Sequence, residues 1–252
     1  METVSIPAAE AADFEEYKQR KKRLELKARM RNMEPTLLRR NASTGEIRSL
    51  CEQARRHSFV CVCVQPVYVK TCRNLLKGSG VGISCLVGGN SESTLKSKLY
   101  ECKCAFRDGA SEIDFIPAVS AVANGNYAYL KKEVKKVIAK ARGKTVKVRL
   151  DSFALPPDSF FRAAQAAVDG GAKFLSVCAD EELVEELRRR LKKPCEIKVW
   201  GVETPERFRS MLALGCARIG SELAEDIFHS MESETFSGTA PEGESVKTEG
   251  AQ

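Results

Sequence analysis

Apolar residues in this chain follow two alternating patterns. Short runs rich in β-branched residues, typical of buried strands, are each followed by a segment whose apolar positions recur every three or four residues, as on one helix face. We predict strands at residues 31–34, 59–64, 81–86, 112–116, 146–151, 174–177, 196–199 and 217–220. We predict helices at residues 45–57, 67–78, 91–108, 127–142, 157–170, 180–192, 205–214 and 224–231.

Strand-then-helix units repeated along the whole chain favour an α/β protein with a (β/α)8 TIM barrel. Several strands are continuous apolar runs, as expected when both faces of a parallel sheet are buried. The chain has 252 residues, close to the roughly 250 that such a barrel needs. A doubly wound open sheet is the competing architecture, but it would more naturally show a glycine-rich phosphate turn after its first strand. This chain lacks that turn.

Turn residues fall where these units need them. Gly170 and Gly171 end the helix that precedes the sixth strand, and Thr204 followed by Pro205 opens a later helix as cap and first turn. Other glycines follow predicted helices at places where a left-handed residue costs least, namely Gly78, Gly109, Gly143 and Gly215.

The two ends of the chain differ from its middle. Residues 11–31 are dense in charge and in helix formers, with a basic cluster at residues 18–23, so we predict a surface helix ahead of the core. The end of the chain is rich in Ser, Glu, Gly and Thr and is predicted to be disordered. The expected organisation is a charged helical extension at 1–31, a barrel domain at 32–231 and a disordered tail at 232–252.

Composition narrows the class of protein. The chain is 43% hydrophobic and 30% charged, which is typical of a globular protein with a sizeable core. It has no apolar run near the roughly 18 residues of a membrane span, and its first residues lack a signal-peptide core. Ten cysteines without an export signal indicate free thiols in a reducing compartment. We expect a cytoplasmic protein without a membrane partner. Its net charge of +7 is ordinary for solubility alone and is also compatible with an anionic substrate or an acidic partner.

Short motifs carry a resemblance to a known family. They lie at residues 63–66, 75–81, 109–114, 147–151, 171–174 and 218–221, and they include Glu112-Ile113-Asp114 and Arg218-Ile219-Gly220-Ser221. In order and spacing they resemble the deoxyribose-phosphate aldolases over about residues 33–231. The resemblance implies a TIM barrel and a class I aldolase without metal or cofactor. Such an enzyme cleaves 2-deoxyribose 5-phosphate into glyceraldehyde 3-phosphate and acetaldehyde through a lysine Schiff base.

The resemblance assigns roles to several residues. Asp114 would act in proton transfer, and Lys198 matches the family's second lysine, which lowers the pKa of the Schiff-base lysine by like-charge repulsion. Lys147 matches another interior lysine, and because a buried lysine needs a partner we expect it to pair with Asp114 or Asp151. Cys63 matches a cysteine beside the substrate. Two of these assignments have a structural alternative. Asp114 would then only pair with a lysine, and Cys63 would be a small apolar core residue.

Departures from the family cluster at the catalytic face. Ser176 stands where the family has its Schiff-base lysine, and a serine cannot form that adduct. The polar loop that follows is replaced over residues 176–180. Glu34 takes the place of an early aspartate, and Ala118 that of an asparagine after the fourth strand. We take Ser176 as the lost catalytic position and Glu34 as a substrate-side residue.

The end of the barrel that binds phosphate in the family also differs. Gly201 keeps one glycine of the phosphate turn, but a second glycine is missing, Trp200 places a bulky indole in the turn, and Glu203 replaces an arginine. In Gly220-Ser221-Glu222 an acid replaces a second serine. We expect Gly201, Gly220 and Ser221 to line what is left of the substrate site. Each added carboxylate would repel a phosphate by about 1 kcal/mol or more at short range.

Two functions follow from this comparison. The first is a degenerate aldolase that retains the barrel, has lost the family reaction, and binds a phosphorylated sugar only if the site survives. Its basic N-terminal helix would favour an acidic partner such as an actin filament or nucleic acid, and we expect a monomer or homodimer. The alternative is an active class I aldolase on another aldehyde, with Lys198 or Lys147 as Schiff-base donor and Asp114 as proton shuttle.

A metal site built from cysteines is the least favoured of the functions considered. Cys61 and Cys63 face one side of a strand, whereas Cys102 and Cys104 diverge on a helix. Neither pair has the Cys-x2-Cys spacing of structural zinc sites, so we expect no metal there.

Overall fold

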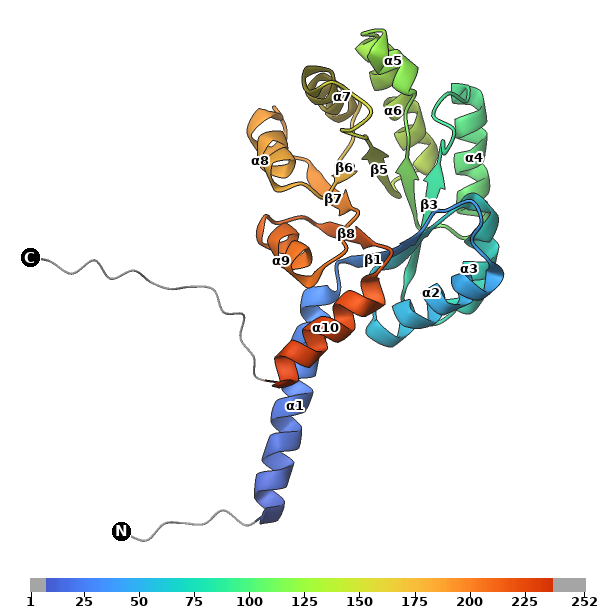
Figure 1. Ribbon diagram of the computed structural model, residues 1–252. Helices are drawn as coiled ribbons and strands as arrows, with labels where there is room; N and C mark the ends of the chain where they lie inside the picture. Colours follow the sequence, from blue (N-terminus) through green and yellow to red (C-terminus); the bar gives the residue numbers. More distant parts are fainter. Residues whose placement is uncertain (1–7, 238–252) are drawn as a thin grey trace, which may run out of the picture.

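The computed structural model describes residues 8–237, with side chains from residue 16 to residue 236. In this part of the chain the strands pair in parallel, in sequence order, and β1 also pairs with β8 to close a barrel (Figure 1). The predicted (β/α)8 fold is therefore confirmed. The strands are β1 (Met33–Leu37), β2 (Cys61–Val64), β3 (Gly82–Val87), β4 (Glu112–Phe115), β5 (Thr145–Arg149), β6 (Phe174–Cys178), β7 (Glu196–Trp200) and β8 (Arg218–Ser221).

Helices surround the barrel (Figure 1). They are α1 (Ala8–Met30), α2 (Thr44–His57), the 3-10 turn η1 (Pro66–Tyr68), α3 (Val69–Leu75), α4 (Leu95–Asp108), α5 (Val119–Ala123), α6 (Tyr127–Ala141), α7 (Pro157–Asp169), α8 (Glu181–Arg190), α9 (Pro205–Ala213) and α10 (Ala224–Ser237). As predicted, the side chain of Thr204 caps α9, with Pro205 in the first turn. Over residues 8–237, no helix is both long and apolar enough to cross a membrane.

Several boundaries differ from the prediction. The first strand spans Met33–Leu37 instead of residues 31–34, because α1 continues to Met30. The fourth helix starts at Leu95, after the cap Thr94, and the short α5 was not predicted at all. Its five residues are too few to show a helical period.

The predicted tail begins too early. α10 runs to Ser237, so residues 232–237 are helical and not part of a disordered tail. Ion pairs hold these last turns in place, since Glu232 pairs with Arg23 of α1 and Glu234 with Arg209 of α9. Residues 238–252 of the predicted tail lie outside the described residues.

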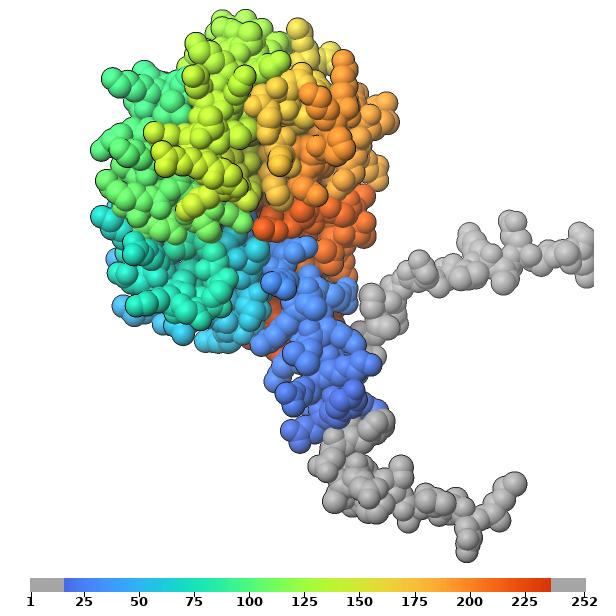
Figure 2. Space-filling model, turned by 180° about the vertical axis from the view of Figure 1, so that it is seen from behind, coloured from blue at the N-terminus to red at the C-terminus, as the bar shows by residue number. Residues whose placement is uncertain are grey.

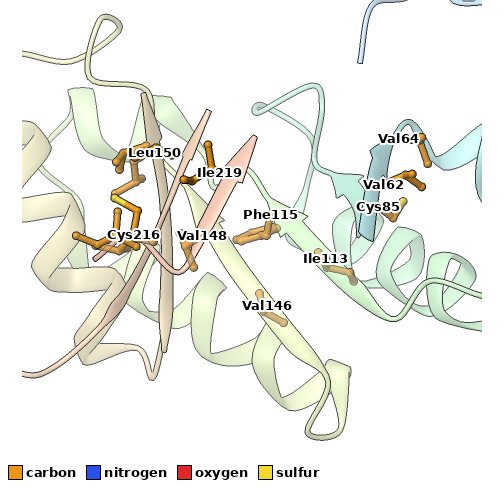
Figure 3. Packing of buried hydrophobic residues seen from close by; sticks show 14 of the residues in the cluster. Val62, Val64, Cys85, Ile113, Phe115, Val146, Val148, Leu150, Cys216 and Ile219 are labelled. Atoms are coloured by element: carbon orange, nitrogen blue, oxygen red, sulfur yellow. The ribbon is translucent and has the colours of Figure 1, made fainter. Parts of the chain in front are cut away.

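Most strands have an apolar outer side and carry polar or charged residues on the inner side. Residues that face the helices are apolar, and Figure 3 shows Val62, Ile113, Phe115, Val146 and Val148 among them. The alternate residues point into the barrel and include buried charged side chains. The expectation of strands that are apolar on both faces therefore holds for the outer side only, because the inner side carries buried charged residues such as Asp114, Lys147 and Lys198.

α1 and α10 pack against each other and project together from the barrel (Figures 1 and 2). Leu26 and Met30 of α1 are buried, whereas residues 16–25 are all exposed. The predicted charged surface helix is therefore present, and its basic cluster faces solvent.

Candidate active site

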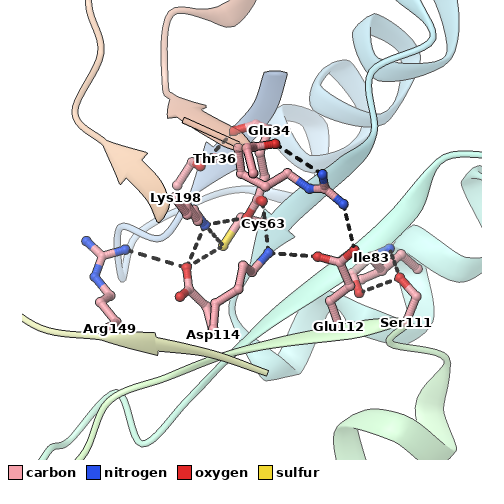
Figure 4. Close-up of polar contacts among 12 residues, drawn as sticks. Glu34, Thr36, Cys63, Ile83, Ser111, Glu112, Asp114, Arg149 and Lys198 are labelled. Atoms are coloured by element: carbon pink, nitrogen blue, oxygen red, sulfur yellow. Dashed lines mark hydrogen bonds and ion pairs between the residues drawn. The ribbon is translucent and has the colours of Figure 1, made fainter. Parts of the chain in front are cut away.

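Two lysines and three carboxylates form an ion-pair network inside the barrel (Figure 4). Lys198 on β7 donates to Asp114 on β4, at 2.6 Å between Nζ and Oδ2, and makes a second ion pair with Glu34 on β1. Lys147 on β5 donates to Glu34 and to Glu112 of β4, each at 2.9 Å. Glu34 thus joins the two lysines, and five side chains from four strands act as one unit.

Two arginines extend the network at its edges. Arg218 on β8 lies 3.4 Å from Glu112, and Arg149 on β5 lies 4.0 Å from Asp114. The three carboxylates therefore face four cationic groups, which leaves one positive charge. Each buried acid therefore has a basic partner, while one cationic charge of the network has no acid to balance it.

Neighbouring charges fix the protonation of the lysines and of Glu34. Burial lowers the pKa of Lys198, but Asp114 and Glu34 outweigh burial and raise that pKa above its usual value. The pKa of Lys147 is likewise raised, because Glu34 and other nearby anionic groups outweigh burial. For Glu34, burial raises the pKa but the two lysines outweigh it, so the pKa falls far below its usual value. Both lysines are therefore charged at neutral pH.

Cys63 on β2 touches the same network. Its Sγ lies 3.9 Å from both Lys198 Nζ and Asp114 Oδ2. Burial raises the pKa of this thiol to about 12. Because only a thiolate is an effective nucleophile, Cys63 is a neutral, inert side chain at this position.

Ser176 lies between the cationic strands but takes no part in the network. Its Cα pairs in register with Arg149 on one side and with Lys198 on the other. The side chain is fully buried, and its hydroxyl has no hydrogen-bond partner among the described residues.

An aromatic side chain lies at the carboxyl end of the barrel. Trp200 is the last residue of β7, and its ring stacks on the guanidinium of Arg149, with 4.3 Å between the ring centroid and Cζ. These residues come from the strands on either side of β6, so their contact crosses over Ser176. Substrates of TIM-barrel enzymes enter at this carboxyl end of the barrel.

Sequence comparison finds relatives that match this chain over most of its length. The deoxyribose-phosphate aldolase of Caldicellulosiruptor saccharolyticus is 35% identical over 198 residues, which cover 74% of this chain and 90% of that protein. The chain belongs to the deoxyribose-phosphate aldolase family. The Bdellovibrio bacteriovorus aldolase is 33% identical over 202 residues, covering 76% and 91%. No protein-family model matches the chain.

Solved structures of deoxyribose-phosphate aldolases share the fold. A putative one from Coccidioides immitis superposes with a TM-score of 0.77 at 24% identity, over 82% of this chain and 86% of that one. The aldolase from Aeropyrum pernix, described as a unique tetramer, gives a TM-score of 0.75 at 21% identity, over 84% and 96%. These likenesses support the barrel and say nothing of individual residues.

Within this deoxyribose-phosphate aldolase barrel, most predicted site residues come together. Asp114, Lys198, Lys147, Glu34 and Cys63 share one cluster, and Ser176 lies beside it. Gly220 makes room for the cluster: a Cβ there would lie 3.4 Å from Cε of Lys198 and 3.2 Å from the Val199 carbonyl oxygen. Its lack of a side chain lets Lys198 cross the interior.

Two predicted phosphate-side residues lie apart from the network. The Ser221 hydroxyl is buried and accepts a hydrogen bond from the Leu223 backbone N–H at 2.9 Å, so it closes a local turn. Gly201 adopts a positive φ of 80° in the turn after β7. This backbone conformation accounts for the retained glycine without a ligand.

The predicted partners of Lys147 were wrong. Lys147 bonds Glu34 and Glu112, whereas Asp114 bonds Lys198. Asp151 is exposed and accepts a hydrogen bond from the Phe153 backbone N–H at 2.9 Å. The reason is geometric, since Asp151 follows the end of β5 and leaves the barrel interior.

Glu112, Arg149 and Arg218 belong to the site but were given no role from sequence. Their signal was present, because Glu112 and Asp114, and likewise Lys147 and Arg149, are two residues apart in apolar strands. That spacing puts both charges of each pair on the same, inward side.

The interior also holds acid and cysteine groups at metal-ligand distances. Glu34 lies with Cys63 and Asp114 in one such group, and with Cys61 and Glu112 in another. The ammonium groups of the two interior lysines bond the carboxylates of both groups and take the place that a cation would fill.

Proposed function

We propose that this member of the aldolase family has lost the Schiff-base reaction and retains the barrel for another role. One observation carries the proposal: both interior lysines are held as ammonium ions between carboxylates. A Schiff base forms only from a neutral amine, and class I aldolases obtain one by lowering the pKa of a lysine. Here the pKa of Lys147 and of Lys198 is raised instead.

The position assigned to the family's covalent lysine supports the same proposal. Ser176 has no amine, and its hydroxyl has no basic neighbour to activate it, since the adjacent side chains in register are cationic. Where comparable nucleophiles were removed from other enzymes, turnover fell by on the order of 10⁶. The stack of Trp200 on Arg149 further restricts access from the mouth.

A second candidate is an aldolase that uses Lys198. The contact that favours it is the 2.6 Å hydrogen bond from Lys198 to Asp114, because a carboxylate at that distance could take a proton from the amine and return it to an intermediate. A second carboxylate argues against this candidate, because Glu34 also pairs with Lys198 and keeps the amine protonated.

Borohydride trapping and turnover separate these two candidates. We expect the wild-type protein to show no cleavage of 2-deoxyribose 5-phosphate above background. After brief treatment with acetaldehyde and cyanoborohydride, peptide mapping should find no adduct at Lys147 or Lys198, whereas exposed lysines are modified in every variant alike. Ser176→Lys should gain a trapped adduct at residue 176, and Ser176→Met is the size-matched control without an amine. A wild-type adduct that disappears in Lys198→Met would replace the first proposal by the second.

We further propose that the projecting helix α1 binds an acidic partner. Residues 16–25 are exposed, and they contain the basic cluster at residues 18–23. Part of the cluster is engaged with α10, because Lys22 donates to the Thr235 carbonyl at 3.5 Å and Arg23 pairs with Glu232. Arg20 and Lys21 are exposed on the same helix and offer positive charge to a filament or protein surface such as actin.

Co-sedimentation with actin filaments tests this second role. We expect binding that weakens as salt rises, and that drops in Arg20→Gln/Lys21→Gln. Lys135→Gln/Lys136→Gln on α6 removes the same charge elsewhere on the surface and is the matched control. Equal loss in both variants would mean that net charge alone is responsible. A cytoplasmic monomer or homodimer stays our prediction for location and assembly.

A further inference from the structure

The chain contains two histidines, and the fold brings them together. His57 is the last residue of α2 and His229 lies on α10, 172 positions later, yet their ring centroids are 5.7 Å apart. Glu225 lies between them: its Oε1 is 3.7 Å from His57 Nε2 and 3.9 Å from His229 Nε2. One atom of each of the three side chains therefore lies within 4.8 Å of the other two.

We propose that His57, Glu225 and His229 bind a divalent transition-metal ion of the zinc class at the junction of α2 and α10. Two imidazoles and one carboxylate are ligands that zinc accepts. With bonds of about 2.0–2.2 Å, neighbouring ligand atoms on tetrahedral zinc lie roughly 3.3 Å apart. The two separations from Glu225, 3.7 and 3.9 Å, exceed this value by about half an ångström, and all three ligand atoms lie within 4.8 Å of one another, so metal binding would draw the side chains together. With three protein ligands, the fourth coordination position of the zinc ion would be taken by water.

The buried histidine has the state that a metal ligand needs. His57 is only 4% exposed, and its Nε2, which faces Glu225, has no hydrogen-bond partner among the described residues. A ring nitrogen in this position can offer its lone pair to a metal ion. A buried polar atom without a partner is uncommon, and a metal ion would satisfy it.

The exposed histidine has a carboxylate on its far nitrogen. Nδ1 of His229 lies 3.7 Å from Oε2 of Glu232, while Nε2 faces Glu225. In metal sites a carboxylate in this position orients the ring and makes the ligating nitrogen more basic. Glu232 also pairs with Arg23 of α1 at 3.1 Å, so the proposed site is linked to the N-terminal helix.

One cation competes for the site. Arg56 contacts Oε1 of Glu225 at 2.9 Å, but its side chain is 62% exposed. An exposed ion pair of this kind is worth about 0–1 kcal/mol, so a metal ion can displace it. This competition gives the proposal a signature that a merely structural cluster lacks: removing the arginine should strengthen metal binding.

The test is a Zn²⁺ titration of the full chain, free of any histidine tag and stripped with a chelator. We expect one Zn²⁺ per chain and a higher midpoint of thermal unfolding as Zn²⁺ is added. His229→Gln should abolish this binding, and Glu232→Gln should weaken it about 10–100-fold. Arg56→Gln should tighten it severalfold. Asp226→Asn removes a neighbouring exposed acid of α10 and should change nothing.

Free cysteines are the competing explanation for bound metal. Co²⁺ in the same titration should give weak visible bands without the intense near-ultraviolet charge transfer of a thiolate ligand. Because the side chain of His229 is 53% exposed, its replacement leaves the core intact and the fold can be verified by circular dichroism. No Zn²⁺ binding by the wild type, binding unchanged in His229→Gln, or a thiolate spectrum would each overturn the proposal.

Discussion

The ammonium of Lys198 lies 2.6 Å from the carboxylate of Asp114, and both side chains are buried in the barrel. A lysine this close to a carboxylate retains its proton, and the carboxylate gains a permanent counter-ion. The same two residue types that would pass a proton during aldol chemistry therefore form a structural ion pair. Their value to the protein should then appear in the free energy of unfolding.

Lys198→Met should destabilise the protein by about 3–5 kcal/mol. The substitution removes the cation shared by Asp114 and Glu34 and leaves buried acids with fewer partners. Urea denaturation followed by circular dichroism measures the change. Lys193→Met is the control, since Lys193 pairs with Asp169 at 3.7 Å and its side chain is 65% exposed. A loss below about 1 kcal/mol in Lys198→Met would show that the interior pair contributes little.

Stability should depend on pH at both ends of the scale. The pKa of Glu34 is depressed in the folded state, so its contribution is present above its usual value of 4.5 and is lost as pH falls. The pKa of Lys198 is raised, so its contribution is present below 10.5 and is lost as pH rises through the folded value. Between these limits the two groups give a flat profile.

Glu34→Gln isolates the acid limb of that profile. The variant has no proton to gain at this position, so the free energy of unfolding should fall less steeply between about pH 5 and pH 3 than in the wild type. Urea titrations at several pH values measure both slopes. Equal slopes would mean that other carboxylates, and not the barrel interior, govern acid denaturation.

Strand order and barrel closure were predictable because each unit repeats the same apolar pattern. The interior network was predictable only in part. Lys147 and Asp114 were recognised as interior residues, but their pairing depends on which strands face each other across the barrel. Sequence spacing places Lys147 on the inward side of β5 and does not tell whether Glu34, 113 positions earlier, reaches it. The partners of a buried charge are set by closure of the whole barrel.

Trp200 was noted in sequence as a bulky residue in a glycine turn, and its contact with Arg149 explains how the barrel accommodates it. In Ser176→Lys/Trp200→Ala the mouth should be more open than in Ser176→Lys. We therefore expect a larger fraction of chains to carry an acetaldehyde adduct at residue 176 after cyanoborohydride treatment, as read by peptide mapping. Ser176→Lys/Tyr100→Ala removes an exposed aromatic residue elsewhere and is the control. Equal trapping in the three variants would show that Trp200 does not limit access.

A second buried ion pair joins α4 and α6 outside the barrel. Lys98 and Glu133 are both fully buried, with 2.9 Å between Lys98 Nζ and Glu133 Oε1. Glu133 also accepts a hydrogen bond from the Ala118 backbone N–H at 2.8 Å, so it anchors the start of α5. Because Lys98 also lies 5.5 Å from the Phe115 ring centroid, an apolar side chain would be well packed at its position.

Lys98→Met should cost about 3–5 kcal/mol, because it leaves the Glu133 carboxylate charged and buried without its cation. Lys98→Met/Glu133→Gln should recover most of that loss, since the amide oxygen still accepts from the Ala118 N–H and carries no charge. Urea denaturation of Lys98→Met, Glu133→Gln and the double variant gives the coupling energy between the two sites. If the double variant were as unstable as the single one, the lysine would contribute through packing of its methylene chain and not through its charge.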